Sequence, residues 1–189
     1  MFLTDRHGIS GRLKVVAFLL LAAGLSVFLS GCGMTDSEYA GKLLVIIDKF
    51  DSFKVSYSEE FKGLSNSVDM ENYQDSEIED AKKRNNLIAS SSAKKLKEIR
   101  NEVEGLDAPN SRMQEKKDGF LKYLDKYTES LAKSHESFSI MYNALLNVDE
   151  AAMYEAFELQ ADSGLDSIEA VKGIIKLKDD LQSIKDEGN

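Results

Sequence analysis

The chain carries few residues that perform covalent or metal chemistry. Of its 189 residues, one is cysteine, two are histidine and none is tryptophan. A single cysteine cannot form a disulfide within the chain, and two histidines cannot supply a site built from three imidazoles. The surroundings of Cys32 and His135 in the sequence therefore decide which chemistry is open to the protein.

Cys32 follows a segment that has the form of a secretory signal peptide. Residues 1–14 carry three basic side chains and one acidic side chain, and residues 15–28 carry no charge. A basic stretch before an apolar stretch of this length is typical of such a signal. The alternative is a transmembrane helix, because the uncharged run from 15 to 35 has 21 residues and is long enough to span a bilayer. The small residues at its end and the position of the cysteine favour the signal peptide.

The segment ends with the tetrapeptide Leu29, Ser30, Gly31 and Cys32. An aliphatic residue, two small residues and a cysteine resemble the lipobox of bacterial lipoproteins. The resemblance implies that the thiol of Cys32 receives a diacylglyceryl group. It also implies that signal peptidase II recognises the three residues before Cys32 and cuts there, after which the new amine can be acylated. Two or more acyl chains anchor a protein stably, so the membrane is the first expected partner.

The resemblance predicts how the chain is organised. Residues 1–31 are a cleaved signal peptide, 32–35 a short lipidated tether, 36–185 a helical domain and 186–189 a frayed end. The mature chain then carries 21 basic and 32 acidic residues, a net charge of −11 against −9 for the whole chain. Such a charge disfavours binding to nucleic-acid phosphates and provides no basic face for an anionic lipid surface.

The residue after the cysteine bears on location. In many Gram-negative lipoproteins an aspartate at this place retains the protein in the inner membrane, and here the residue is Gly33. The resemblance therefore implies the outer membrane if the host is Gram-negative. Lysine outnumbers arginine 19 to 5, a bias of AT-rich genomes that favours a Gram-positive host. In that case we expect a lipid anchor on the extracytoplasmic face of the cell membrane.

The residues after the tether predict four long helices. Apolar side chains recur at steps of three and four, as one buried helical face requires, and the one proline is Pro109. The four stripes run from Tyr39 to Leu64, from Ile78 to Leu106, from Met113 to Leu145 and from Met153 to Leu181. Short connections make neighbouring helices antiparallel. We therefore expect an all-α protein, an antiparallel four-helix bundle after an N-terminal signal helix.

Capping patterns predict where the helices begin and end, and helical spacing predicts which side chains of the fourth helix are buried. A serine followed three residues later by Glu or Gln can form a capping box, aspartate caps a helix start, and glycine often follows the last turn. The capping candidates are Ser76 with Glu79, Ser111 with Gln114, Asp149, Gly63 and Gly105. The side chains expected to be buried in the fourth helix are Met153, Phe157, Leu165, Ile168, Val171, Ile175 and Leu181.

The sequence contains no recognisable catalytic set. Di-iron bundles use Glu-x-x-His, but Ala132 stands three residues before His135. A serine elbow, a phosphate loop and a calcium loop are missing too. We expect His135 at the boundary of a buried face, with a pH-sensitive or ligand-contacting role as the alternative. The acidic run 69–80 is interpreted as a solvated loop and helix start, with cation binding as the alternative. We therefore expect no enzyme, no cofactor and no bound metal.

A polar stretch in the second helix is the one candidate for a binding groove. Here serine and asparagine occupy positions at or near those where the stripe calls for apolar side chains. The candidate groove residues are Asn85, Ser91 and Ser92, with Ser134 and Gln160 as companions. The alternative is that these small side chains pack closely against bulky aromatic neighbours.

Two functions follow from these observations. The first is a membrane-anchored cell-envelope lipoprotein whose helical domain binds an envelope protein, a peptide or a wall component without catalysis. The second is a small-molecule-binding, cation-binding or sensory lipoprotein that uses the polar groove. A hydrolase that depends on His135 is a third, less favoured interpretation, because no strained turn presents a serine to this histidine.

Overall fold

The computed structural model describes residues 33–68 and 72–188. These residues contain four α-helices and no strand. The helices are α2 (Asp36–Ser65), α3 (Asp75–Glu104), α4 (Ser111–Asn147) and α5 (Glu150–Glu187). None of these helices is both long and apolar enough to cross a membrane. The predicted signal helix, with the tetrapeptide that ends in Cys32, lies outside the described residues.

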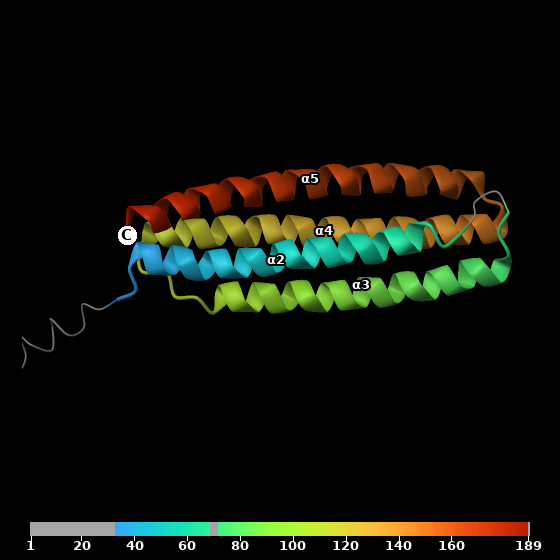
Figure 1. Cartoon of the computed structure of the whole chain (residues 1–189). Coiled ribbons are helices and arrows are strands. Elements are labelled where there is room, and N and C mark those ends of the chain that lie inside the picture. Colours follow the sequence, from blue (N-terminus) through green and yellow to red (C-terminus); the bar gives the residue numbers. More distant parts are fainter. Residues whose placement is uncertain (1–32, 69–71, 189) are drawn as a thin grey trace, which may run out of the picture. The chain divides into compact units, whose positions relative to one another are not determined.

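The four helices form the predicted antiparallel bundle. Each helix runs opposite to the one before it (Figure 1). α2 packs against α3 and α5, and α4 packs against the same two helices, so that α3 and α5 lie on one diagonal of the bundle. The most extensive contact is between α4 and α5. The all-α fold class and the four-helix bundle are therefore confirmed.

The core is built from the stripes predicted for α2, α3 and α4. Phe50 of α2 is fully buried, and its ring lies edge-on to Phe120 and Tyr127 of α4, with centroid distances of 6.2 and 5.0 Å. Ile78 and Val103 close the two ends of the α3 face and are also fully buried. Burying a large apolar side chain contributes about 1.5–3 kcal/mol to stability, so these three faces supply much of the stability of the bundle.

The stripe predicted to be buried in α5 is wrong. Phe157, Leu165, Ile168 and Ile175 are each more than half exposed, and of the seven predicted residues only Leu181 is buried. The buried face of α5 is made instead by Ala156, Ser163, Ala170, Ile174, Leu177, Leu181 and Ile184. Its first half thus consists of small side chains, and α5 has apolar residues on two opposite sides.

Hydrogen bonds between α4 and α5 explain which side is buried. The Ser137 hydroxyl donates to the carbonyl of Ala156 at 2.7 Å, and the Ser163 hydroxyl donates to the carbonyl of Ser130 at 2.7 Å. The donor and acceptor positions are seven residues apart on each helix and run in opposite directions, as antiparallel helices require. Because these bonds bring one backbone close to the other, the interface accepts small side chains and leaves the large ones outside.

Two of the predicted helix boundaries are confirmed. The side chain of Asp149 caps α5 by accepting a hydrogen bond from the backbone N–H of Ala152 at 3.1 Å. Gly105 directly follows α3, and its N–H donates to the carbonyl of Asn101 at 3.0 Å. At the other end of the chain α5 continues to Glu187, two residues beyond the expected end of the ordered domain.

The other capping predictions are displaced by one or two residues. α3 begins with a capping box of Gln74 and Glu77 instead of Ser76 and Glu79, because the Tyr73 hydroxyl, bonded to the carbonyl of Leu145 at 3.1 Å, holds the chain against α4 just before. α4 is capped by Asn110, which accepts from the Met113 N–H at 3.0 Å, instead of Ser111 with Gln114. Gly63 lies inside α2, which continues because Leu64 is fully buried.

Val148 ends α4 in a conformation that is costly for its side chain. Its φ of 55° and ψ of 45° lie in the left-handed region, and its N–H donates to the carbonyl of Ala144. A β-branched residue is a rare occupant of this region, which glycine adopts without steric cost. The Val148 side chain is 84% exposed and therefore contributes little packing in return.

We expect Val148→Gly to stabilise the protein by about 1 kcal/mol, because glycine removes the left-handed strain at this position. The measurement is urea denaturation followed by circular dichroism. The matched control is Val55→Gly, since Val55 is 62% exposed inside α2. There the same substitution should destabilise by a few tenths of a kcal/mol, because glycine is a poor helix former. If Val148→Gly is no more stable than the parent, the left-handed conformation of Val148 does not cost stability.

Candidate functional site

A buried polar network centred on His135 joins three helices of the bundle. His135 of α4 is 6% exposed. Its Nε2 lies 3.2 Å from the hydroxyl of Tyr57 on α2, and its Nδ1 lies 2.7 Å from Oδ1 of Asn85 on α3. The Asn85 amide nitrogen donates to the carbonyl of His135 at 2.9 Å and to the Ser139 hydroxyl at 3.1 Å. His135 is thus an interior residue, and its expected place at a boundary is wrong.

The geometry of this network sets the protonation of the imidazole. The amide nitrogen of Asn85 is already used as a donor, so its oxygen accepts from Nδ1–H of His135. Nε2 is then free to accept from the Tyr57 hydroxyl. Burial lowers the pKa of His135 to about 4, and burial raises the pKa of Tyr57. Both groups are therefore neutral near pH 7, with both ring nitrogens hydrogen-bonded.

The predicted groove residues fall into separate places. Asn85 and Ser92 are buried between α3 and α4. Ser134 is buried toward the opposite side, where its hydroxyl donates to Oε1 of Gln160 on α5 at 3.2 Å. Ser91 is exposed, and its hydroxyl donates within its own helix. The five residues do not line one polar groove.

A groove of about 440 Å³ does lie between α3 and α4. Its α3 wall includes Ala89, Ser92 and Ala93, and its α4 wall includes Leu131 and His135. Small side chains on α3 leave this space, and the walls are mostly apolar. Of the five predicted groove residues only Ser92 lines this space, and the sequence indicated neither its apolar character nor the part of His135 in it. The volume falls in the range of small-ligand sites.

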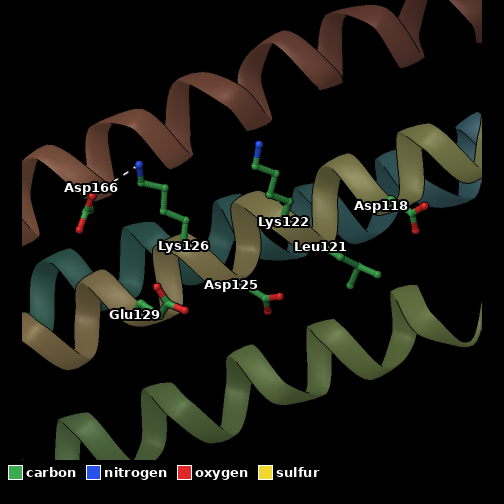
Figure 2. A pocket seen from close by; sticks show the side chains of 7 residues that line it. All are labelled: Asp118, Leu121, Lys122, Asp125, Lys126, Glu129 and Asp166. Carbon is green, nitrogen blue, oxygen red and sulfur yellow. Dashed lines mark ion pairs between the residues drawn. The ribbon is translucent and has the colours of Figure 1, made fainter.

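A second hollow, of about 540 Å³, lies on the outer surface of α4 and is lined mainly by charges. Figure 2 shows Lys122 and Lys126 pointing toward α5, whereas Asp125 points toward α3. Lys126 pairs with Asp166 of α5 at 3.5 Å, and Asp125 pairs with Arg100 of α3. These charges bind neighbouring helices instead of converging on one point. Within residues 33–68 and 72–188, no three His, Cys, Asp or Glu side chains are placed to hold a metal ion.

Among residues 33–68 and 72–188, the exposed large apolar side chains gather mainly on the outward side of α5. We call it the outer face of α5; it consists of Tyr154, Phe157, Ala161, Leu165, Ile168 and Ile175, all exposed. These residues follow one another at helical spacing over 22 positions, which is about 33 Å of helix. The exposed valines of α2 and Leu87 of α3 stand singly. Contiguous exposed apolar residues mark interaction sites, whereas single ones do not.

The lowered pKa of His135 predicts a specific pH dependence of stability. Between the unfolded value of 6.5 and the folded value of about 4, the unfolded chain binds a proton at this residue and the folded chain does not. The contribution of His135 to the free energy of unfolding should therefore reach its maximum above pH 6.5 and fall as the pH drops toward 4. We expect a loss of about 2 kcal/mol from this residue between pH 7.5 and pH 5, measured by urea denaturation.

The control for this measurement is His135→Gln, which removes the titrating ring. The variant should be less stable at pH 7.5, because Tyr57 and Asn85 lose their partner. Its stability should nevertheless change less than that of the parent between pH 7.5 and pH 5. The same pH dependence in both proteins would show that His135 titrates normally and that the neutral network is wrong.

Comparison of the chain with known protein families, with curated proteins and with solved structures found no match. Three features of the chain bear on its function: the groove between α3 and α4, the outer face of α5 and the N-terminal segment.

Proposed function

We propose that this protein is a lipid-anchored protein of the bacterial cell envelope whose helical domain binds a protein partner through the outer face of α5, without catalysis. The anchor in this proposal is Cys32, at the end of the segment that resembles a lipoprotein signal. The observation that carries the binding function is that α5 exposes five large apolar side chains along one side, each by more than half.

The composition of this face suits protein binding. Tyr154 and Phe157 provide two aromatic side chains near the start of α5, and aromatic residues supply large contact areas and dominate the energy of interfaces. Leu165, Ile168 and Ile175 continue the face along the helix. Covering such surface contributes roughly 25 cal/mol for each Å² removed from water, so a partner helix lying along α5 would gain its main stabilisation there.

The anchor supports this function by concentrating the protein. Asp36, the first residue of α2, follows Cys32 by four residues, so a lipidated cysteine would hold the bundle close to the bilayer. Confinement to a surface raises the effective concentration of partners in the same membrane. The net charge of −11 in the mature chain supports attachment through acyl chains instead of through basic side chains. The location proposed is the extracytoplasmic face of a Gram-positive cell membrane.

A small-molecule function is the second candidate, and one observation favours it. The groove between α3 and α4 has a volume of about 440 Å³ and mostly apolar walls, which suits an apolar ligand better than a polar one. Its one ionisable lining residue, His135, already has partners at both ring nitrogens. The outer face of α5 is preferred because it exposes far more apolar surface.

Replacement of the anchoring residue tests the first half of the proposal. In Cys32→Ser the nucleophilic thiol is lost, so cells grown with labelled palmitate should not label the protein, and residues 1–31 should remain attached. The matched control is Ser30→Ala, which keeps a small residue in the tetrapeptide and should be labelled and cleaved. The measurements are fluorography and intact mass. Labelled Cys32→Ser protein would refute lipid attachment at this residue.

Capture of partners in intact cells tests the second half. The parent protein should yield a specific crosslinked species, and Ile168→Glu should lose at least nine-tenths of it, because a charge in the centre of an apolar interface must be desolvated. The matched control is Val55→Glu, since Val55 on α2 is 62% exposed against 54% for Ile168, and its crosslinking should be unchanged. Persistence of the species in Ile168→Glu would mean that the outer face of α5 is not the site.

A further inference from the structure

We infer that the partner bound by the outer face of α5 is a second copy of this chain, with the two α5 helices antiparallel about a twofold axis at Leu165. The inference rests on the proposed function, because it assigns an occupant to the same face. A twofold interface uses one surface of both copies, so the face must be complementary to itself. Leu165, 68% exposed, would contact its own equivalent at the centre.

The sizes of the side chains are complementary in this register. Ala161 lies four residues before the axis and Ile168 three residues after it, and both are exposed. Antiparallel pairing therefore brings Ala161 of one copy nearly level with Ile168 of the other, a small side chain against a large one. Gly164 has no packing role inside the described bundle, since no atom of a neighbour would come within 4 Å of a Cβ added there.

The charges beside the face select the antiparallel orientation. Glu158 stands seven residues before Leu165 and Lys172 seven residues after it, and both are exposed. Neither side chain forms an ion pair inside the described part of the chain. About an axis at Leu165, Glu158 of each copy lies beside Lys172 of the other, so that the pair forms twice. In a parallel arrangement like charges would come to the same level, and this complementarity would be lost.

The area of the face indicates a dimer that depends on the membrane. A stable complex of standard size buries about 800 Å² on each partner. A helix face about 33 Å long and 10–12 Å wide offers about 400 Å². We therefore expect dissociation in dilute solution and pairing where the anchor raises the effective concentration. Antiparallel pairing puts the two Asp36 residues at opposite ends of the dimer, so copies in one membrane would pair with their long axes along its surface.

Crosslinking of the full chain in host membranes tests the register. In Leu165→Cys, two thiols should meet across the axis, and a short thiol-reactive crosslinker should convert a large share of the protein to a covalent dimer. Val55→Cys is the matched control because Val55 is similarly exposed, 62%, on α2; it should give no dimer above the background of the unsubstituted chain. No dimer from Leu165→Cys overturns the inference.

Charge exchange in the Leu165→Cys background tests the orientation. Glu158→Lys alone and Lys172→Glu alone should each lower the dimer yield severalfold, because each places like charges together. The double variant Glu158→Lys/Lys172→Glu should restore the yield, and so should co-expression of the two single variants. The two positions are 14 residues apart, about 21 Å along one helix, so restoration cannot arise within a chain. If the single variants lower the dimer yield but the double variant and the co-expressed pair do not restore it, the antiparallel pairing is overturned.

Combining this assay with the capture experiment separates the two proposals. If Leu165→Cys gives no dimer while Ile168→Glu still abolishes capture of a different protein, the second copy is wrong and the face belongs to that other partner. If neither a dimer nor a captured protein depends on the outer face of α5, both the inference and the proposed binding function fail.

Discussion

The close approach of α4 to α5 is the constraint on which the rest of the structure depends. Two serine hydroxyls, those of Ser137 and Ser163, each donate to a carbonyl of the opposite helix at 2.7 Å. Both hydroxyls are buried and satisfied without water, which matters because an unpaired buried hydroxyl costs several kcal/mol. The two helices can come this close because Ala156 and Ala170 add little bulk. Around these two serines the stability comes from close packing of small side chains, whereas Ile174, Leu177 and Leu181 add large buried side chains further along α5.

This constraint accounts for both candidate surfaces. Because the first half of the inner side of α5 is small, the large apolar residues Phe157, Leu165 and Ile168 lie on the opposite side and form most of the outer face. α4 meets α3 differently, for Ala89 and Ala93 are small there too but a groove of about 440 Å³ remains beside them. The two interfaces differ in the length of the side chains that bridge them. Between α4 and α5, serine hydroxyls bond directly to backbone carbonyls and draw the helices together. Between α4 and α3, the bridge is made by the longer side chains of His135 and Asn85.

Charge reinforces the same arrangement. Lys116 pairs with Asp180 across α4 and α5 at 2.6 Å, and Lys178 pairs with Asp51 across α5 and α2 at 2.8 Å. These exposed pairs contribute little individually, but they occupy the charged residues along both edges of α5 where it meets its neighbours. Glu158 and Lys172 border the outer face, and neither forms an ion pair within residues 33–68 and 72–188. These two charges therefore lie on the side of α5 that faces away from the bundle, where they could select a partner by its charge.

The helices and three of their buried faces follow from the sequence alone, because the periodicity that predicts them acts over a few residues. The stripes of α2, α3 and α4 each have one apolar side, so burial had one solution, and Asp149 capped α5 as local chemistry requires. Of the predicted groove residues, only Ser92 lines the hollow beside α3. The lipid anchor at Cys32 is likewise a prediction from local sequence.

The orientation of α5 and the interior position of His135 arise only when the helices pack. A helix with apolar residues on two sides can bury either side without breaking the helical spacing. The spacing of large residues such as Phe157 and Leu165 therefore favoured burial of the side that is in fact exposed. The choice depends on the shape of α4 and on bonds between residues far apart in sequence, such as Ser163 with Ser130, 33 residues away. In the same way His135 is interior because Tyr57 and Asn85 come from two other helices to satisfy its ring. Local pattern cannot contain such pairings, because they exist only once the helices have packed.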